Sequence, residues 1–101
     1  MSIPPVITGQ LPMLYDICNE FEVKELALFG SALTERFAPE SDLDLLVEFK
    51  PKARVGLFRF LGLQNRLAEL FHRKVDLVPK NTLKPFLRER VLKQAEIIYA
   101  G

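Results

Sequence analysis

Residues 28–49 read LFGSALTERFAPESDLDLLVEF, and this stretch decides the fold that we expect for the chain. A short apolar strand ends there at Gly30-Ser31, where glycine lets the backbone approach a ligand and a following helix would offer amide protons to a phosphate. Asp42 and Asp44 come ten residues later, at the start of a second strand. Side chains alternate along a strand, so both carboxylates should point to the same face. Two like charges beside a core repel unless a cation lies between them, so the pair indicates a metal site.

Asp76 adds a third carboxylate to this pattern. It stands between Val75 and Leu77 in the short apolar stretch 74–78, which predicts another strand. If that strand lies beside the one that begins at Asp42, three acidic groups meet near a phosphate-binding turn, as in sites that transfer nucleotidyl groups with two metal ions. Each feature alone has a simpler interpretation: a plain turn, a capping pair and an exposed edge residue. Their combination in this order favours a catalytic site.

The chain has a single cysteine, Cys18, and a single histidine, His72. An intramolecular disulfide is therefore impossible, and a zinc site built from these residue types is disfavoured. A bound metal would be held by carboxylates, which predicts a hard ion such as magnesium or manganese. We expect a cytoplasmic protein, because the first ten residues do not have the pattern of a signal peptide and no apolar run approaches the roughly 20 residues of a membrane span.

Apolar spacing predicts one domain over residues 1–101, in which helices flank a small mixed sheet. Residues 1–10 contain two prolines and a glycine and are expected to form a loose arm. Helices are expected at residues 11–21, 31–37, 57–72 and 83–95. Strands are expected at residues 25–29, 42–49 and 74–78. Residues 97–99 could form a last strand or finish the helix before them. The order is typical of an α/β or α+β fold.

The net charge of +1 hides an uneven distribution. Residues 1–49 carry two basic against nine acidic side chains, and residues 50–101 carry twelve basic against four acidic ones. The near-neutral total gives no reason to expect binding to a membrane or directly to nucleic acid. The acidic half contains the Asp42–Asp44 pair, and the basic half offers cations for a triphosphate or for an acidic partner.

The order Gly30-Ser31, ten residues, Asp42-Leu43-Asp44 resembles the signature of the DNA polymerase β-like nucleotidyltransferases. The length of the chain, the stretch 75–78 (VDLV) and the stretch 87–92 (LRERVL) are similar to those of the minimal nucleotidyltransferase (MNT) domains in that superfamily. The resemblance implies the nucleotidyltransferase fold. It also implies an antitoxin that transfers AMP from ATP to a hydroxyl, expected to be that of a tyrosine, on a partner HEPN-domain RNase toxin.

The same resemblance implies a role for each motif residue. Asp42 and Asp44 would hold two magnesium ions. Asp76 would hold the catalytic ion and help to remove the proton of the attacking hydroxyl. Gly30 and Ser31 would hold the β- and γ-phosphates of ATP.

The chain departs from the family pattern at two positions. Thr34 and Ala38 stand where many relatives carry arginines, and Arg36 lies nearby in the sequence. Two other functions therefore stay open. One is an antitoxin that binds its toxin stoichiometrically without catalysis. The other is nucleotidyl transfer to RNA or to a small molecule, which ranks last for RNA because the chain has no further domain to grip a strand.

Overall fold

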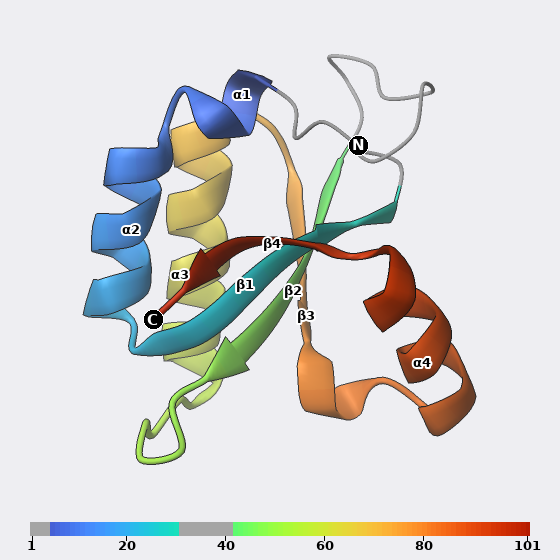
Figure 1. Ribbon diagram of the computed structural model, residues 1–101. Coiled ribbons are helices and arrows are strands. Elements are labelled where there is room, and N and C mark those ends of the chain that lie inside the picture. Colours follow the sequence, from blue (N-terminus) through green and yellow to red (C-terminus); the bar gives the residue numbers. More distant parts are fainter. Residues whose placement is uncertain (1–4, 31–41) are drawn as a thin grey trace.

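A computed structural model describes residues 5–30 and 42–101 (Figure 1). Within these residues the order of elements is α1 (Pro5–Thr8), α2 (Leu11–Glu20), β1 (Val23–Phe29), β2 (Leu43–Phe49), α3 (Leu57–Phe71), β3 (Val75–Pro79), the 3-10 helix η2 (Lys80–Thr82), α4 (Pro85–Gln94) and β4 (Glu96–Ala100). The helix expected at residues 31–37 falls outside the described residues. The other expected helices and strands are confirmed, with ends that differ by two residues at most.

The four strands form one mixed sheet in the order β3-β2-β1-β4. β1 runs antiparallel to both β2 and β4, whereas β2 and β3 are parallel. Parallel neighbours need a crossover connection, and α3 supplies it between β2 and β3. The undecided residues 97–99 lie within β4, which covers the free edge of β1. The expected α+β fold with a small mixed sheet is therefore confirmed.

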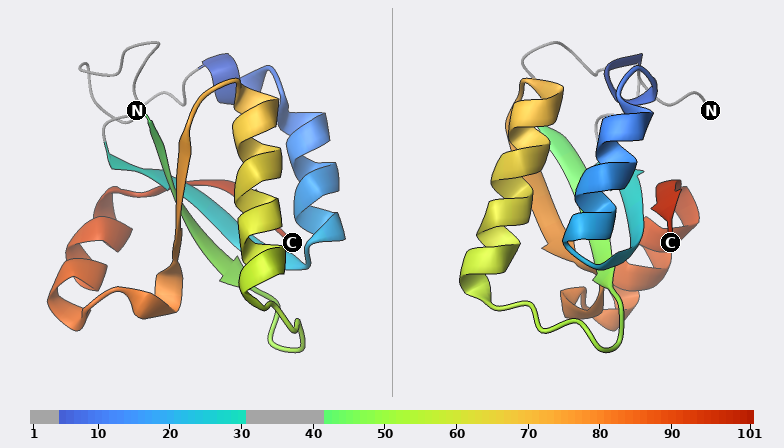
Figure 2. Two further views of the ribbon diagram at one scale, coloured as in Figure 1. Left: turned by 180° about the vertical axis from the view of Figure 1, so that it is seen from behind. Right: turned by 90° about the vertical axis from the view of Figure 1, so that its left-hand side faces the viewer.

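The hydrophobic core lies between the sheet and the two helices α2 and α3, which pack on the same face (Figure 2). Alternate residues of β2 point into it, so Leu43, Leu45 and Val47 are buried. The helices contribute apolar residues at steps of three and four, as expected for one helical face. These buried helical residues are Leu14, Ile17, Cys18, Leu63, Leu67 and Phe71.

The first ten residues are not a loose arm from Pro5 onward, so that prediction is wrong for the described part. Residues Pro5–Thr8 form a single helical turn, and the Ile7 side chain is fully buried in the core. The Gly9 amide donates to the Pro5 carbonyl at 2.9 Å, which closes the turn. Burying an isoleucine side chain is worth about 2–3 kcal/mol, and this gain opposes the entropy lost on ordering the segment.

None of the helices formed by residues 5–30 and 42–101 is both long and apolar enough to cross a bilayer. The longest, α3, has 15 residues and carries charged side chains along its exposed face.

Candidate active site

Two of the three predicted carboxylates lie opposite each other in the sheet. β2 and β3 pair in parallel with Asp44 in register with Asp76, and neighbouring strands are about 4.8 Å apart. The residues that flank each of them, Leu43 and Leu45 on β2 and Val75 and Leu77 on β3, are buried in the core. Since side chains alternate, Asp44 and Asp76 share the sheet face that α2 and α3 leave uncovered. Asp44 is half-buried there, and Asp76 is exposed.

Asp42 immediately precedes β2 and is exposed. It is separated from Asp44 by the buried Leu43, so the burial pattern agrees with the predicted common face. Within residues 5–30 and 42–101, however, no group of three His, Cys, Asp or Glu side chains is arranged to hold a metal ion. The sheet thus pairs Asp44 with Asp76 and leaves Asp42 beside them, while the assignment of all three as metal ligands stays a prediction.

Gly30, the residue directly after β1, adjoins the same site. Phe29, the last residue of β1, pairs with Asp44 across the antiparallel ladder, so the chain turns at Gly30 directly beside that carboxylate. Gly30 has a φ of +77°, a left-handed conformation that side chains other than hydrogen disfavour. A Cβ at Gly30 would lie 3.1 Å from the Asp44 Cγ and collide with its Oδ2. A glycine is therefore required here to leave room for the carboxylate. Ser31, the other predicted turn residue, lies outside the described residues.

The donor chemistry of this site fits a hard divalent cation, because carboxylate oxygens are the ligands that magnesium and manganese prefer. The space that Gly30 leaves at Asp44 is consistent with a carboxylate that must reach a ligand. The carboxylates at this end of β2 and β3 therefore fit metal binding.

Lys74 is a residue that the sequence reasoning did not single out. The Leu43 amide donates to the Lys74 carbonyl at 2.9 Å, which extends the β2–β3 ladder by one residue. Lys74 is exposed and precedes the buried Val75, so it lies on the same face as Asp76, across the ladder from Asp42. Lys74 and Asp76 are two residues apart, and this spacing could have indicated from the sequence that their side chains share one face of a strand. Thr34, Arg36 and Ala38 lie outside the described residues.

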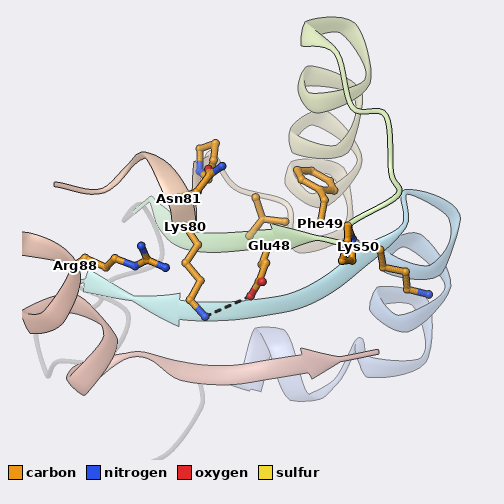
Figure 3. Close-up of a pocket in the computed structure, with 9 residues that line it drawn as sticks. Glu48, Phe49, Lys50, Lys80, Asn81 and Arg88 are labelled. Atoms are coloured by element: carbon orange, nitrogen blue, oxygen red, sulfur yellow. Dashed lines mark hydrogen bonds and ion pairs between the residues drawn. The ribbon is translucent and has the colours of Figure 1, made fainter. Parts of the chain in front are cut away.

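A cavity of about 340 Å³ lies elsewhere, at the other end of β2. Figure 3 shows Lys80 pointing toward Glu48, with Arg88 reaching in from α4. Glu25 and Glu48 pair across β1 and β2, and the Lys80 Nζ lies 3.2 Å and 3.4 Å from their carboxylates. Burial by itself would raise the pKa of Glu48, but Lys24 and Lys80 outweigh it and hold the pKa below its usual value. The cavity is thus a basic pocket with an internal ion pair, separate from the Asp44–Asp76 pair.

Comparison with known proteins gives consistent matches over most of the chain. A family model described as the nucleotidyltransferase domain matches residues 12–98. Protein adenylyltransferase MntA of Thermococcus cleftensis is 33% identical over 84 residues, which are 83% of this chain and 81% of that protein. A Methanocaldococcus jannaschii protein named as a candidate protein adenylyltransferase is 31% identical over 82 residues, 80% of either chain.

Solved structures of similar fold agree with these matches. One described as a candidate minimal nucleotidyltransferase superposes with a TM-score of 0.76 at 29% identity and covers 94% of both chains. A structure of a tri-AMPylated Shewanella oneidensis HEPN toxin in complex with an MNT antitoxin contains a chain of the same fold. That chain superposes with a TM-score of 0.67 at 18% identity, over 94% of this chain and 73% of its own length.

Proposed function

The chain belongs to the nucleotidyltransferase family, and from that premise we propose that it transfers AMP from ATP to a hydroxyl of a partner HEPN-domain toxin, as the antitoxin of a toxin–antitoxin pair. The observation that carries the proposal is the in-register pair Asp44–Asp76 next to Gly30, whose missing side chain leaves room for the Asp44 carboxylate. Paired carboxylates on one exposed sheet face are the donor set that this chemistry needs.

The relatives support the choice of substrate and partner. The Thermococcus cleftensis relative is named a protein adenylyltransferase. A toxin–antitoxin complex that contains a chain of the same fold was solved with AMP-PNP, an ATP analogue. In the Shewanella oneidensis complex, the HEPN toxin itself carries AMP groups. We propose further that the acceptor hydroxyl belongs to a tyrosine of the toxin, as the family resemblance implies.

In the proposed reaction, the acceptor hydroxyl oxygen forms a bond to the α-phosphorus of ATP. The bond between the α-phosphorus and the bridging oxygen breaks, and pyrophosphate leaves. Asp42, Asp44 and Asp76 would hold two magnesium ions, or manganese, which stabilise charge on the phosphates and align an in-line attack. Asp76 accepts the proton of the hydroxyl, directly or through water. Gly30 and Ser31 bind the β- and γ-phosphates.

We assign Lys74 to the leaving pyrophosphate. Its ammonium can take the role that arginines have in many relatives, where this chain carries Thr34 and Ala38. The ladder bond between Leu43 and Lys74 ties this cation to the edge of the sheet that bears Asp42. A cation at this edge would neutralise charge that develops on the leaving group, which lowers the barrier.

A stoichiometric antitoxin is the second candidate. Thr34 and Ala38, which stand where many relatives carry arginines, favour it. A single measurement separates the two candidates. An enzyme neutralises the toxin at a small molar fraction, whereas a stoichiometric inhibitor needs one chain for each toxin that it blocks.

The test incubates the chain with magnesium, ATP labelled at the α-phosphate, and the HEPN-domain protein encoded beside it. We expect label on the toxin and neutralisation at one antitoxin to about twenty toxins. Asp44→Asn should lower the transfer rate by at least about a thousandfold, because it removes a charged ligand of the magnesium ions that would stabilise charge on the reacting phosphate. Asp16→Asn, on the exposed side of α2, is the matched control and should leave the rate unchanged. Transfer of label that is equal in the wild type and in Asp44→Asn would contradict the proposal.

A further inference from the structure

Helix α4 is set apart from the rest of the fold. The sheet lies between α4 and the two helices that cover the core (Figures 1 and 2). None of the residues of α4 is buried, and the Phe86 side chain on it is 72% exposed. Leu87 and Leu92 are also exposed on the same helix. A helix of ten residues gains little stability by itself in water, so an exposed apolar helix of this length is well suited to a protein contact.

The surroundings of α4 are strongly basic. The helix and the residue before it carry Lys84, Arg88, Arg90 and Lys93 against the single acid Glu89. On one side Arg88 lines the cavity of about 340 Å³ together with Lys80 and Lys50 (Figure 3). On another side a shallower hollow of about 290 Å³ runs along α4 itself, lined by Phe86, Glu89, Arg90, Lys93 and Gln94. The two hollows therefore lie on two sides of α4, and each is lined by cations.

The cavity lies away from the reacting groups, whereas α4 leads into Glu96, which pairs with Leu28 two residues before Gly30. The cavity is lined by residues at the end of β2, Val47–Phe49, whereas Asp44 stands at its beginning. Asp44 and Phe49 are five positions apart, which is about 17 Å along the strand. A small acceptor held at the cavity would not reach the reacting phosphate, but a protein can touch both places at once.

We propose that α4 and the adjoining basic cavity form the docking surface for the acceptor protein, a partner with an acidic surface that also exposes apolar side chains. This inference rests on the proposed function, since it names where the toxin is held. Charge complementarity selects an acidic occupant. Phe86, Leu87 and Leu92 favour a protein over RNA, because phosphates would neutralise the cations but leave two exposed leucines without apolar contacts. A second copy of the chain is excluded as the occupant of this surface if the free protein is monomeric in solution.

The experiment compares two double variants in binding to the HEPN-domain protein. Phe86→Ala with Arg90→Glu removes an exposed ring and reverses a charge on α4. Met13→Ala with Asn65→Glu makes a similar change on α2 and α3, where both residues are exposed on the other side of the sheet. Binding is measured by titration calorimetry at low and high salt. AMP transfer and affinity for a fluorescent ATP analogue are measured on the same samples.

We expect the α4 variant to bind the toxin at least about tenfold more weakly, as for central aromatic and arginine contacts, with unchanged affinity for the ATP analogue. The control variant should bind like the wild type. If the α4 variant binds the toxin as tightly as the wild type while the wild type transfers AMP, the docking surface is wrong and the proposed function stands. If no protein transfers AMP to the toxin, the proposed function itself fails. Loss of RNA binding rather than toxin binding in the α4 variant, or dimerisation of the wild type through α4, would also overturn the inference.

Discussion

Replacing Gly30 with alanine should damage stability and activity together. The φ of +77° at Gly30 costs an L-amino acid about 1–2 kcal/mol. The added Cβ would meet the Asp44 carboxylate, and turning that side chain out of its rotamer costs about another 0.5–1.5 kcal/mol. We therefore expect a loss of about 2–3 kcal/mol in the free energy of unfolding, which corresponds to a fall in Tm of about 10–20 °C for a domain of this size.

The assay combines thermal unfolding followed by circular dichroism with the rate of AMP transfer at 25 °C. Displacing the Asp44 carboxylate by about 1 Å should lower kcat about a hundredfold. Gly62→Ala in α3 is the matched control. Its new Cβ would lie 3.6 Å from Phe21 Cε2, an ordinary contact, and alanine in a helix is worth up to about 1 kcal/mol over glycine. The control should therefore unfold at a slightly higher temperature than the wild type and keep its activity.

Two results would refute this reasoning. If Gly30→Ala unfolds at the temperature of the wild type, the left-handed turn and the close approach to Asp44 do not constrain this position. If the variant is destabilised but transfers AMP at the wild-type rate, the position of the Asp44 carboxylate is not required for the reaction.

Three further predictions concern single side chains. Lys74→Met should lower kcat about tenfold, as expected for a lost contact to a charge that develops in the transition state, and leave Tm unchanged; an unaltered kcat in steady-state kinetics would contradict its role. Burial raises the pKa of Cys18 to about 12, so a thiol reagent at pH 8 should modify it only in urea; rapid labelling of the folded protein, detected by mass, would contradict this. Lys80→Met should cost up to about 1 kcal/mol at pH 7, because Glu25 and Glu48 then lose the cation that they share, and only Lys24 stays paired with Glu48. Since the folded pKa of Glu48 is lowered below its ordinary value of 4.5, this stabilisation is present above pH 4.5 and is lost as the pH falls through the lowered pKa. Urea titrations of wild type and variant should therefore converge at acidic pH; a constant difference would refute the ion-pair account.

Much of the candidate site could be predicted from local sequence. Asp42 and Asp44 are two residues apart on a strand, and a strand has only one way to orient such a pair. The buried Leu43 between them agrees with that geometry. Gly30 was expected to let the backbone approach a ligand. The structure adds that its missing Cβ makes room for Asp44, a contact between two strands that no local pattern specifies.

Other features could not be predicted because they depend on pairing between distant segments. Residues 1–10 look unstructured by composition, but Ile7 finds a place in the core that only the packed helices create. The exposure of Phe86 and Leu92 depends on α4 lying across the sheet from α2 and α3 (Figure 1). Spacing along a helix specifies a stripe of side chains but not which other element, if any, covers it.

The sequence by itself determined the described elements from α2 to α4 and the family signature, and it predicts Asp42, Asp44 and Asp76 as the carboxylates of the site. These depend on short-range rules: the period of a strand, the period of a helix, and the turns at glycine and proline. The tertiary structure decided that β3 pairs with β2 in the register that brings Asp76 opposite Asp44 and Lys74 beside Asp42. A shift of one residue would have turned Asp76 into the core. The cost of burying that charge, together with the gain from burying Val75 and Leu77, selects the observed register.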